Sequence, residues 1–215
     1  MTLTNIPTAD NGPKSGRISE NIPKNLQITN GYQCPYPCIK MYRFMDISIA
    51  TLPIYPEILD RTKNGDNFLD PGCCLGQEIR QLVFDGTPSK NTYGSDLYGG
   101  CFPVGYKLFK DQDRLQTTFI AADIFDNTSK LTELEGKINI IYTGAFFHLF
   151  GLEEQKKIAA KLFSCWRHGR GRWFADSSQG MRSQGSMGGK AIRVEESLFG
   201  IIHKVGKSCG TMLVR

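Results

Sequence analysis

Residues 68–76, with the sequence Phe-Leu-Asp-Pro-Gly-Cys-Cys-Leu-Gly, constrain the fold more than any other stretch of the chain. A short apolar run ends at Asp70, and Gly72 and Gly76 follow before an amphipathic segment begins. Glycine tolerates positive φ and lets the backbone approach a ligand, and the first N–H groups of a helix have no partner within the helix. The pattern predicts a strand, a tight turn and a helix start that hold a nucleotide-like molecule.

The carboxylate of Asp70 narrows the kind of ligand. Loops that bind dinucleotides or phosphates carry Gly-x-Gly-x-x-Gly or Gly-x4-Gly-Lys-Ser/Thr after the strand, and neither spacing occurs here. A nicotinamide dehydrogenase is therefore the least favoured class. Asp70 would repel a phosphate but suits a cation such as the amino acid end of S-adenosylmethionine. An ordinary strand-to-helix turn would explain this short motif about as well, so the downstream residues decide.

The composition predicts one globular domain. The chain has 215 residues, of which 40% are hydrophobic and 11% aromatic, enough for a core. Its longest apolar run, residues 138–150, is broken by Asn139 and His148 and is too short to span a bilayer. We expect a soluble, cytoplasmic protein without a membrane partner. Residues 1–33 are polar and rich in turn-forming side chains, which predicts a flexible arm.

The cysteines favour reduced thiols rather than a disulfide framework. The chain has seven cysteines, lacks a recognisable signal peptide, and places Cys73 and Cys74 side by side. Cys34 and Cys38 lie four residues apart, but no Cys or His pair elsewhere completes a tetrahedral zinc set. We therefore expect no metal site.

Apolar periodicity predicts alternating strands and helices. Strands are expected over residues 68–70, 92–97, 117–122 and 138–143, and helices over residues 75–85, 102–109 and 152–163. Residues 31–61 are dense in apolar side chains and broken by prolines, which favours two short helices separated near Pro53. The alternation predicts a doubly wound α/β fold with a mostly parallel sheet.

The region beyond Trp166 shows no clear pattern. Residues 166–215 hold nine of the 23 glycines, and residues 161–215 hold ten Lys or Arg against three Asp or Glu. We expect no strand pair there, and only a weak helix over residues 194–205. The basic character belongs to this tail and not to the body of the protein, which argues against a nucleic-acid partner. A nucleic-acid enzyme that uses the basic tail is a third hypothesis, which salt-dependent RNA binding would support, but a charged tail that is merely solvated is the favoured interpretation.

Acidic residues end three successive strands. Ligands of open α/β sheets bind at the carboxyl ends of strands, where Asp70, Asp96 and Asp123 would meet. Asp70 would face the amino acid end of the nucleoside, the two oxygens of Asp96 would accept both ribose hydroxyls, and Asp123 would accept the adenine amino group. Any one of these acids would serve equally well as a helix cap. Three in register with a glycine turn favour the ligand.

The segment from Tyr36 to Phe163, about three fifths of the chain, resembles the fungal class I S-adenosylmethionine-dependent methyltransferases of meroterpenoid and related polyketide pathways. The matching stretches are Tyr36-Pro-Cys-Ile39, Phe68-Leu-Asp-Pro-Gly-Cys-Cys-Leu-Gly-Gln77, Leu82-Val-Phe-Asp-Gly86, Tyr93-Gly-Ser-Asp96, Gly105-Tyr-Lys-Leu-Phe109, Phe119-Ile-Ala-Ala-Asp-Ile-Phe-Asp126 and Phe146-Phe-His-Leu-Phe150. The resemblance implies a Rossmann-like fold, S-adenosylmethionine as cofactor, and cofactor contacts at Asp70, Gly72, Gly76, Asp96, Leu97, Asp123 and Ile124. Cys74 stands where the family usually has its middle glycine, and Pro71 where it has another apolar residue.

The resemblance also implies an activity. Family members methylate carboxyl or hydroxyl groups of secondary metabolites, so an O-methyltransferase acting on a small apolar polyketide-terpenoid acceptor is expected. Methyl transfer from a sulfonium needs mainly alignment, and a base only if the acceptor is not ionised. His148 is the candidate base, although a histidine between aromatic side chains more often serves in packing. Phe146, Phe147 and Phe150 would line an acceptor pocket or belong to the core.

The C-terminus departs from the family, whose sheet continues with a fifth strand and an antiparallel hairpin. We divide the chain into an N-terminal arm (residues 1–33), a methyltransferase-like domain (34–166) and a basic, Gly-rich segment (167–215), and expect a sheet that is incomplete after the fourth or fifth strand. A frameshift or an unspliced intron in the gene model would explain this. The alternative function is therefore a catalytically inactive protein that lacks the C-terminal strands. A homodimer is compatible with either function.

Overall fold

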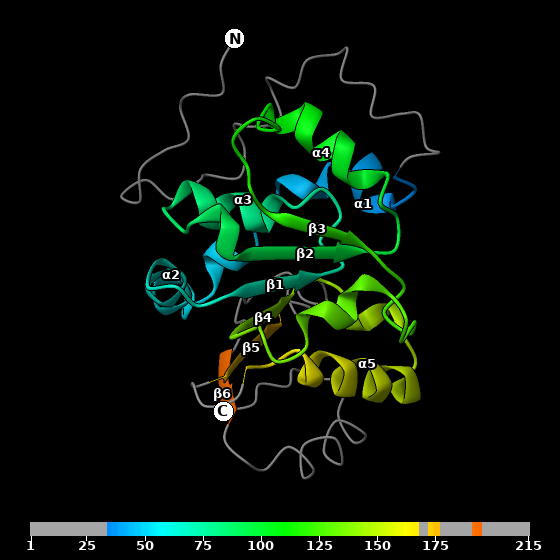
Figure 1. The fold of residues 1–215 in the computed structure, drawn as a ribbon. Helices are drawn as coiled ribbons and strands as arrows, with labels where there is room; N and C mark the ends of the chain where they lie inside the picture. Colours follow the sequence, from blue (N-terminus) through cyan, green and yellow to red (C-terminus); the bar gives the residue numbers. More distant parts are fainter. Residues whose placement is uncertain (1–33, 168–171, 177–190, 195–215) are drawn as a thin grey trace.

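A computed structural model describes residues 34–167, 172–176 and 191–194. These residues form a six-stranded sheet in the order β3-β2-β1-β4-β5-β6 (Figure 1). The strands are β1 (Phe68–Pro71), β2 (Thr92–Asp96), β3 (Thr118–Ala121), β4 (Ile140–Thr143), β5 (Arg172–Asp176) and β6 (Ala191–Val194). Neighbouring strands from β3 to β5 pair in parallel, and β6 pairs antiparallel to β5. The predicted doubly wound, Rossmann-like α/β fold is confirmed.

Helices connect the parallel strands as the apolar periodicity predicts. The α-helices are α1 (Pro37–Lys40), α2 (Tyr55–Lys63), α3 (Gln77–Phe84), α4 (Cys101–Phe109) and α5 (Leu152–Ser164), and short 3-10 helices are η2 (Arg43–Met45), η3 (Ile49–Thr51), η4 (Ser89–Asn91), η5 (Lys130–Leu134) and η6 (Phe147–Leu149). One of the two helices expected around Pro53 is α2. The stretch before Pro53 forms α1 and two single 3-10 turns, and Tyr42 between α1 and η2 adopts a left-handed conformation, at φ +56°, that a continuous helix does not allow.

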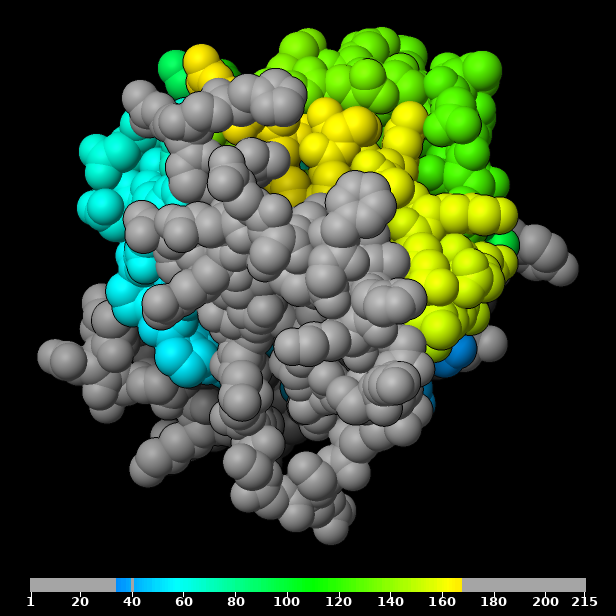
Figure 2. Space-filling model, turned by 90° about the horizontal axis from the view of Figure 1, so that it is seen from below, coloured from blue at the N-terminus to red at the C-terminus, as the bar shows by residue number. Residues whose placement is uncertain are grey.

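Alternate residues of the strands pack on opposite faces of the sheet. Leu69 and Ile141 join the apolar cluster beneath α5, which includes the fully buried Ile158 and Leu162. Phe68, Ile140 and Tyr142 face the other way and pack with α2, α3 and η3. Seen from below, α2 in cyan and α5 in yellow lie on opposite sides of the molecule (Figure 2). The sheet is therefore covered on both faces, as a parallel sheet requires.

The expectation that no strand pair follows Trp166 is wrong. Ile140–Thr143 pairs residue by residue with Trp173–Asp176 of β5, and Arg172–Ala175 pairs with Val194–Ala191 of β6. These strands lie in a glycine-rich part of the sequence and show no apolar alternation, so the sequence did not predict them. β5 forms because it pairs with the hydrogen-bonding edge of β4. β5 and β6 also contradict the expectation that the sheet is incomplete after the fourth or fifth strand. The predicted arm over residues 1–33 lies outside the described residues, as does nearly all of the helix proposed for residues 194–205, whose first residue belongs to β6.

The expectation of reduced thiols is wrong for two cysteines. Cys34, just before α1, forms a disulfide with Cys101, the first residue of α4, although 67 residues separate them in sequence. The fold places their Cα atoms 4.8 Å apart, a proximity that sequence spacing does not reveal. Within the described part of the chain, no helix is long and apolar enough to cross a membrane.

Candidate functional site

The turn after β1 has the geometry that its glycines predict. Gly72 and Gly76 adopt φ values of +76° and +71°, and Cys74 between them adopts φ +52°, so it occupies a conformation that favours glycine. The N–H groups of Gly72 and Cys73 both donate to the carbonyl oxygen of Ser95 on β2, at 2.7 and 3.0 Å. The turn is thereby fixed against the end of the neighbouring strand.

Asp70 is a buried carboxylate at the end of β1. Only 2% of its surface is exposed, and no side chain or N–H group of the described residues donates a hydrogen bond to its carboxylate. Burial, followed by the negative charges of Glu78 and Asp96, raises the pKa of Asp70 well above its usual value. A buried acid without a donor is costly unless a ligand supplies one. The site therefore suits a ligand that brings positive charge.

Asp96 ends β2 beside this turn and accepts three hydrogen bonds. Its Oδ2 accepts from the backbone N–H of Cys74 at 2.8 Å, and its Oδ1 accepts from the N–H of Tyr98 at 3.0 Å and from the hydroxyl of Tyr36 at 2.5 Å. Burial and this hydrogen bond to Asp96 raise the pKa of the Tyr36 hydroxyl, which therefore stays a donor. Asp70 and Asp96 thus frame one end of the glycine turn.

Asp123 follows β3 at the same edge of the sheet. The carboxyl ends of parallel strands meet there, because the register pairs Asp96 with Ala121 and the arrowheads of β1, β2 and β3 point the same way (Figure 1). Asp123 is exposed and accepts a hydrogen bond from the N–H of Phe125 at 2.9 Å, so its carboxylate stabilises a local turn, and no helix starts there. Ile124 is buried, whereas Leu97 is 57% exposed. Their roles in cofactor binding stay predictions.

His148 lies in η6, after β4, and is exposed. The reading in which this histidine only fills space between aromatic side chains is therefore wrong. Phe146 is buried in the cluster beneath α5, and Phe147 and Phe150 pack against it, so these three aromatic side chains belong mainly to the core. Phe146 also covers Gly72: a Cβ atom added to that glycine would overlap its ring. It thereby fixes how closely a ligand approaches the turn from that side.

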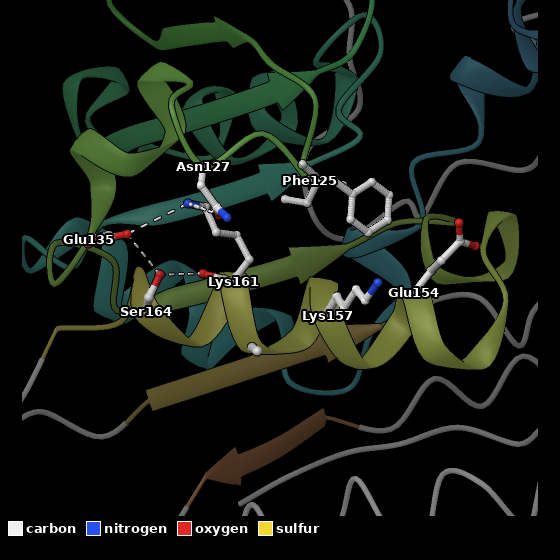
Figure 3. A pocket seen from close by; sticks show the side chains of 9 residues that line it. Phe125, Asn127, Glu135, Glu154, Lys157, Lys161 and Ser164 are labelled. Carbon is white, nitrogen blue, oxygen red and sulfur yellow. Dashed lines mark hydrogen bonds and ion pairs between the residues drawn. The ribbon is translucent and has the colours of Figure 1, made fainter.

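A surface hollow of about 620 Å³ lies between α5 and the segment after β3 (Figure 3). Lys161 reaches toward Asn127 and Glu135 there, at 3.4 and 3.8 Å, and Lys157 and Glu154 line the other end. The hollow touches the predicted cofactor residue Ile124 but none of Asp70, Gly72 and Asp96. It is therefore separate from the acidic turn.

Sequence comparison connects this arrangement with known enzymes. The chain is 52% identical, over 126 residues, to the Asnovolin E/Chermesin D methyltransferase nvfJ of Aspergillus novofumigatus, a match that covers 58% of this chain and 45% of that protein. It is 38% identical over 185 residues to the O-methyltransferase phiE of a fungal species, covering 82% of this chain and 62% of that protein. This chain is similar in sequence to fungal methyltransferases.

The extent of these matches matters for function. The methyltransferase adrK of Penicillium rubens is 48% identical over 128 residues, covering 59% of this chain and 46% of that protein. The chain thus spans about half the length of the curated relatives it matches. No protein-family model matches it. Among solved structures, magnesium protoporphyrin IX methyltransferase from Synechocystis superposes with a TM-score of 0.45 at 20% identity, over 64% of this chain and 60% of that chain.

Two features of this methyltransferase-like site were not assigned from sequence. Tyr36 reaches Asp96 from 60 residues away, and its place in a proline-rich aromatic stretch marked it only as part of a motif. The side chain of Glu78, at the start of α3, accepts hydrogen bonds from the N–H groups of Ser48 and Ile49, both at 3.0 Å, and so ties η3 to the helix that follows the turn. The sequence shows only a glutamate in the first turn of an amphipathic helix, and its burial is visible only in the structure.

Proposed function

We propose that this chain is an S-adenosylmethionine-dependent O-methyltransferase whose acceptor is a carboxyl or hydroxyl group of a small apolar secondary metabolite of polyketide-terpenoid type. One observation supports it above the others: Asp70, a buried carboxylate to which none of the described residues donates a hydrogen bond, stands beside a glycine turn and a second strand-end acid, Asp96. Two acids beside a glycine turn favour a nucleoside that carries positive charge. The homology to fungal methyltransferases supports the same choice, and one relative is named an O-methyltransferase.

Each residue of the turn has a proposed part in holding the cofactor. Asp70 faces its positively charged amino acid end, and the backbone at Gly72 and Gly76 allows close approach. Asp96 accepts the ribose hydroxyls, because two oxygens of one carboxylate suit a vicinal diol. Asp123, Ile124 and Leu97 contact the base. S-adenosylmethionine supplies an activated methyl group when bound, and the protein aligns the acceptor with it.

His148 is the proposed base for a hydroxyl acceptor. It is exposed near the carboxyl ends of the strands, where it can take a proton from an acceptor oxygen. A carboxylate acceptor would need no such base. Substitution of His148 by Asn therefore separates the two acceptor classes: turnover falls for a hydroxyl acceptor and stays for a carboxylate.

Binding and turnover together test the proposal. Calorimetric titration with S-adenosylhomocysteine should give saturable binding, and incubation with labelled S-adenosylmethionine and extracts of a fungal metabolite library should give a methylated product. Binding without turnover across the library would favour the inactive alternative. That alternative rested on missing strands, and β5 and β6 remove this reason for it. Absence of binding at millimolar nucleoside would reject the proposal.

A further inference from the structure

Four cysteines from three separate parts of the chain gather beside the glycine turn. Cys34 and Cys101 form the disulfide that joins the start of α1 to α4, and the Sγ atom of Cys74 lies 3.7 Å from that of Cys34. The Sγ atoms of Cys34, Cys74 and Cys101 all lie within 4.8 Å of one another. Cys38 is partly buried and packs against the same cluster. We refer to these four residues as the thiol cluster.

We propose that the thiol cluster is a thiol–disulfide exchange site that takes electrons from a dithiol reductant and thereby controls access of the nucleoside to Asp96. The control part of this inference rests on the proposed function, whereas the exchange part does not. The structure places the Cys74 thiol next to the Cys34–Cys101 disulfide, and the more exposed Cys38 thiol belongs to the same cluster. Successive thiol–disulfide exchanges can therefore carry electrons from a reductant in solution to the buried disulfide.

The different exposure of the four cysteines decides which one a reductant reaches first. Cys34, Cys74 and Cys101 are 5%, 7% and 0% exposed, whereas Cys38 is partly exposed. A dithiol in solution therefore reaches Cys38 more easily than the disulfide itself. The neighbouring Cys74 thiol lowers the pKa of Cys38 to about 7, so Cys38 is the more acidic thiol of this pair and is partly a thiolate at neutral pH.

The exchange proceeds in three steps. The contact with Cys38 and burial raise the pKa of Cys74, so transfer of the Cys74 proton to the Cys38 thiolate is unfavourable and is the slow part of the first step. Cys74 then attacks the Sγ of Cys34, so that the Cys34–Cys74 bond forms, the Cys34–Cys101 bond breaks, and Cys101 leaves as a thiolate that takes up a proton. Cys38 then loses its proton and attacks Cys74, which forms a Cys38–Cys74 disulfide and releases Cys34. A dithiol finally reduces this more exposed bond: it gives up two electrons and two protons, becomes a disulfide itself, and leaves Cys38 and Cys74 as thiols.

The hydrogen bonds at Asp96 link the redox state of the disulfide to nucleoside binding. A carboxylate oxygen offers about two lone-pair sites, and Oδ1 already accepts from Tyr36 and from the N–H of Tyr98. A ribose diol that donates to both oxygens must therefore displace the hydroxyl of Tyr36. Tyr36 lies two residues from Cys34, so the disulfide restrains it on Asp96. Reduction frees this segment and opens Oδ1.

The exchange path is tested by the rate of reduction. Peptide mapping of protein purified without reductant should find Cys34 linked to Cys101. Dithiothreitol should then reduce this bond at least about tenfold more slowly in C38S and in C74S than in the wild type, because the relay is interrupted. C165S, which removes a buried thiol of α5's C-terminal cap outside the cluster, should react at the wild-type rate. Equal rates in all four proteins, or stoichiometric zinc on reduced cysteines, would overturn the proposal.

The control of Asp96 is tested in the wild-type chain and needs no substitution. Reduction should lower the Kd for S-adenosylhomocysteine by about tenfold, since one hydrogen bond to a charged group no longer competes. Y36F should bind tightly in both redox states. Hydrogen exchange of residues 36–45 should accelerate on reduction whether or not nucleoside binds. Unchanged exchange, or equal Kd values in the two states, refutes the control. If neither state binds but exchange accelerates, the proposed function fails while the restraint on Tyr36 stands.

Discussion

Replacement of Asp70 by Asn separates the functional from the structural cost of this carboxylate. Asparagine keeps the shape of the side chain and removes its charge. The buried carboxylate has no donor among the described residues and lies near Glu78 and Asp96, so the neutral variant should unfold less readily, by about 1 kcal/mol, or 2–4 °C in Tm. The same variant should lose roughly 10- to 150-fold in affinity for S-adenosylhomocysteine, which corresponds to about 1.5–3 kcal/mol for a hydrogen bond to a charged group.

The pH dependence of the free energy of unfolding gives a second test of the buried state of Asp70. Its pKa is raised in the folded protein, so folding favours the protonated acid, and the stability that this preference contributes is lost as pH rises from the ordinary value of 3.8 through the folded value. Wild type and D70N should therefore be equally stable at low pH and diverge as pH rises, with D70N the more stable protein. Denaturant titrations at several pH values measure this difference.

Asp66 provides the control for D70N. It is a buried acid just before β1, but its Oδ2 pairs with Nη2 of Arg61 at 2.5 Å. D66N should consequently lose stability and keep nucleoside affinity, the reverse of D70N. Should D70N bind the nucleoside as tightly as the wild type, or should both variants lose stability alike, the reasoning about a ligand-directed carboxylate is refuted.

Two further predictions concern the structure around the turn. Gly72 and Gly136 have similar positive φ values, +76° and +68°, but a Cβ atom would overlap the ring of Phe146 at Gly72 and would meet nothing within 4 Å at Gly136. Denaturant titrations should therefore show that G72A loses about 2 kcal/mol more stability than G136A. Equal losses would mean that the ring of Phe146 moves aside. Arg80 pairs with Asp111 through Nε–Oδ2 and Nη2–Oδ1 contacts of 2.6 and 3.1 Å in a buried setting, so D111A should cost about 3–5 kcal/mol in the same assay, and a loss below 1 kcal/mol would contradict that account.

Much of the fold follows from local patterns in the sequence. The segment around Asp70, the strand ending at Asp96 and the helix over Leu152–Ser164 have apolar periodicities that leave little choice of structure, and the glycine turn fixes where the sheet meets the first helix. These features depend on residues that are near one another in the chain.

The features that escaped prediction depend on distant partners. The edge of β4 pairs with β5, which lies in a glycine-rich region without alternation. The Cys34–Cys101 disulfide and the contact between Tyr36 and Asp96 each join residues at least 60 positions apart, and they exist only once α1 lies against the turn. Sequence spacing carries no information on such encounters, whereas the topology brings them about.

A crystal structure of the chain with S-adenosylhomocysteine tests the central claim most directly. The account predicts that the ribose hydroxyls lie about 2.5–3.0 Å from the carboxylate of Asp96, that the amino acid end lies over the turn beside Asp70, and that the hydroxyl of Tyr36 has left Oδ1. A nucleoside bound away from the turn, with both acids facing no part of it, would contradict the account.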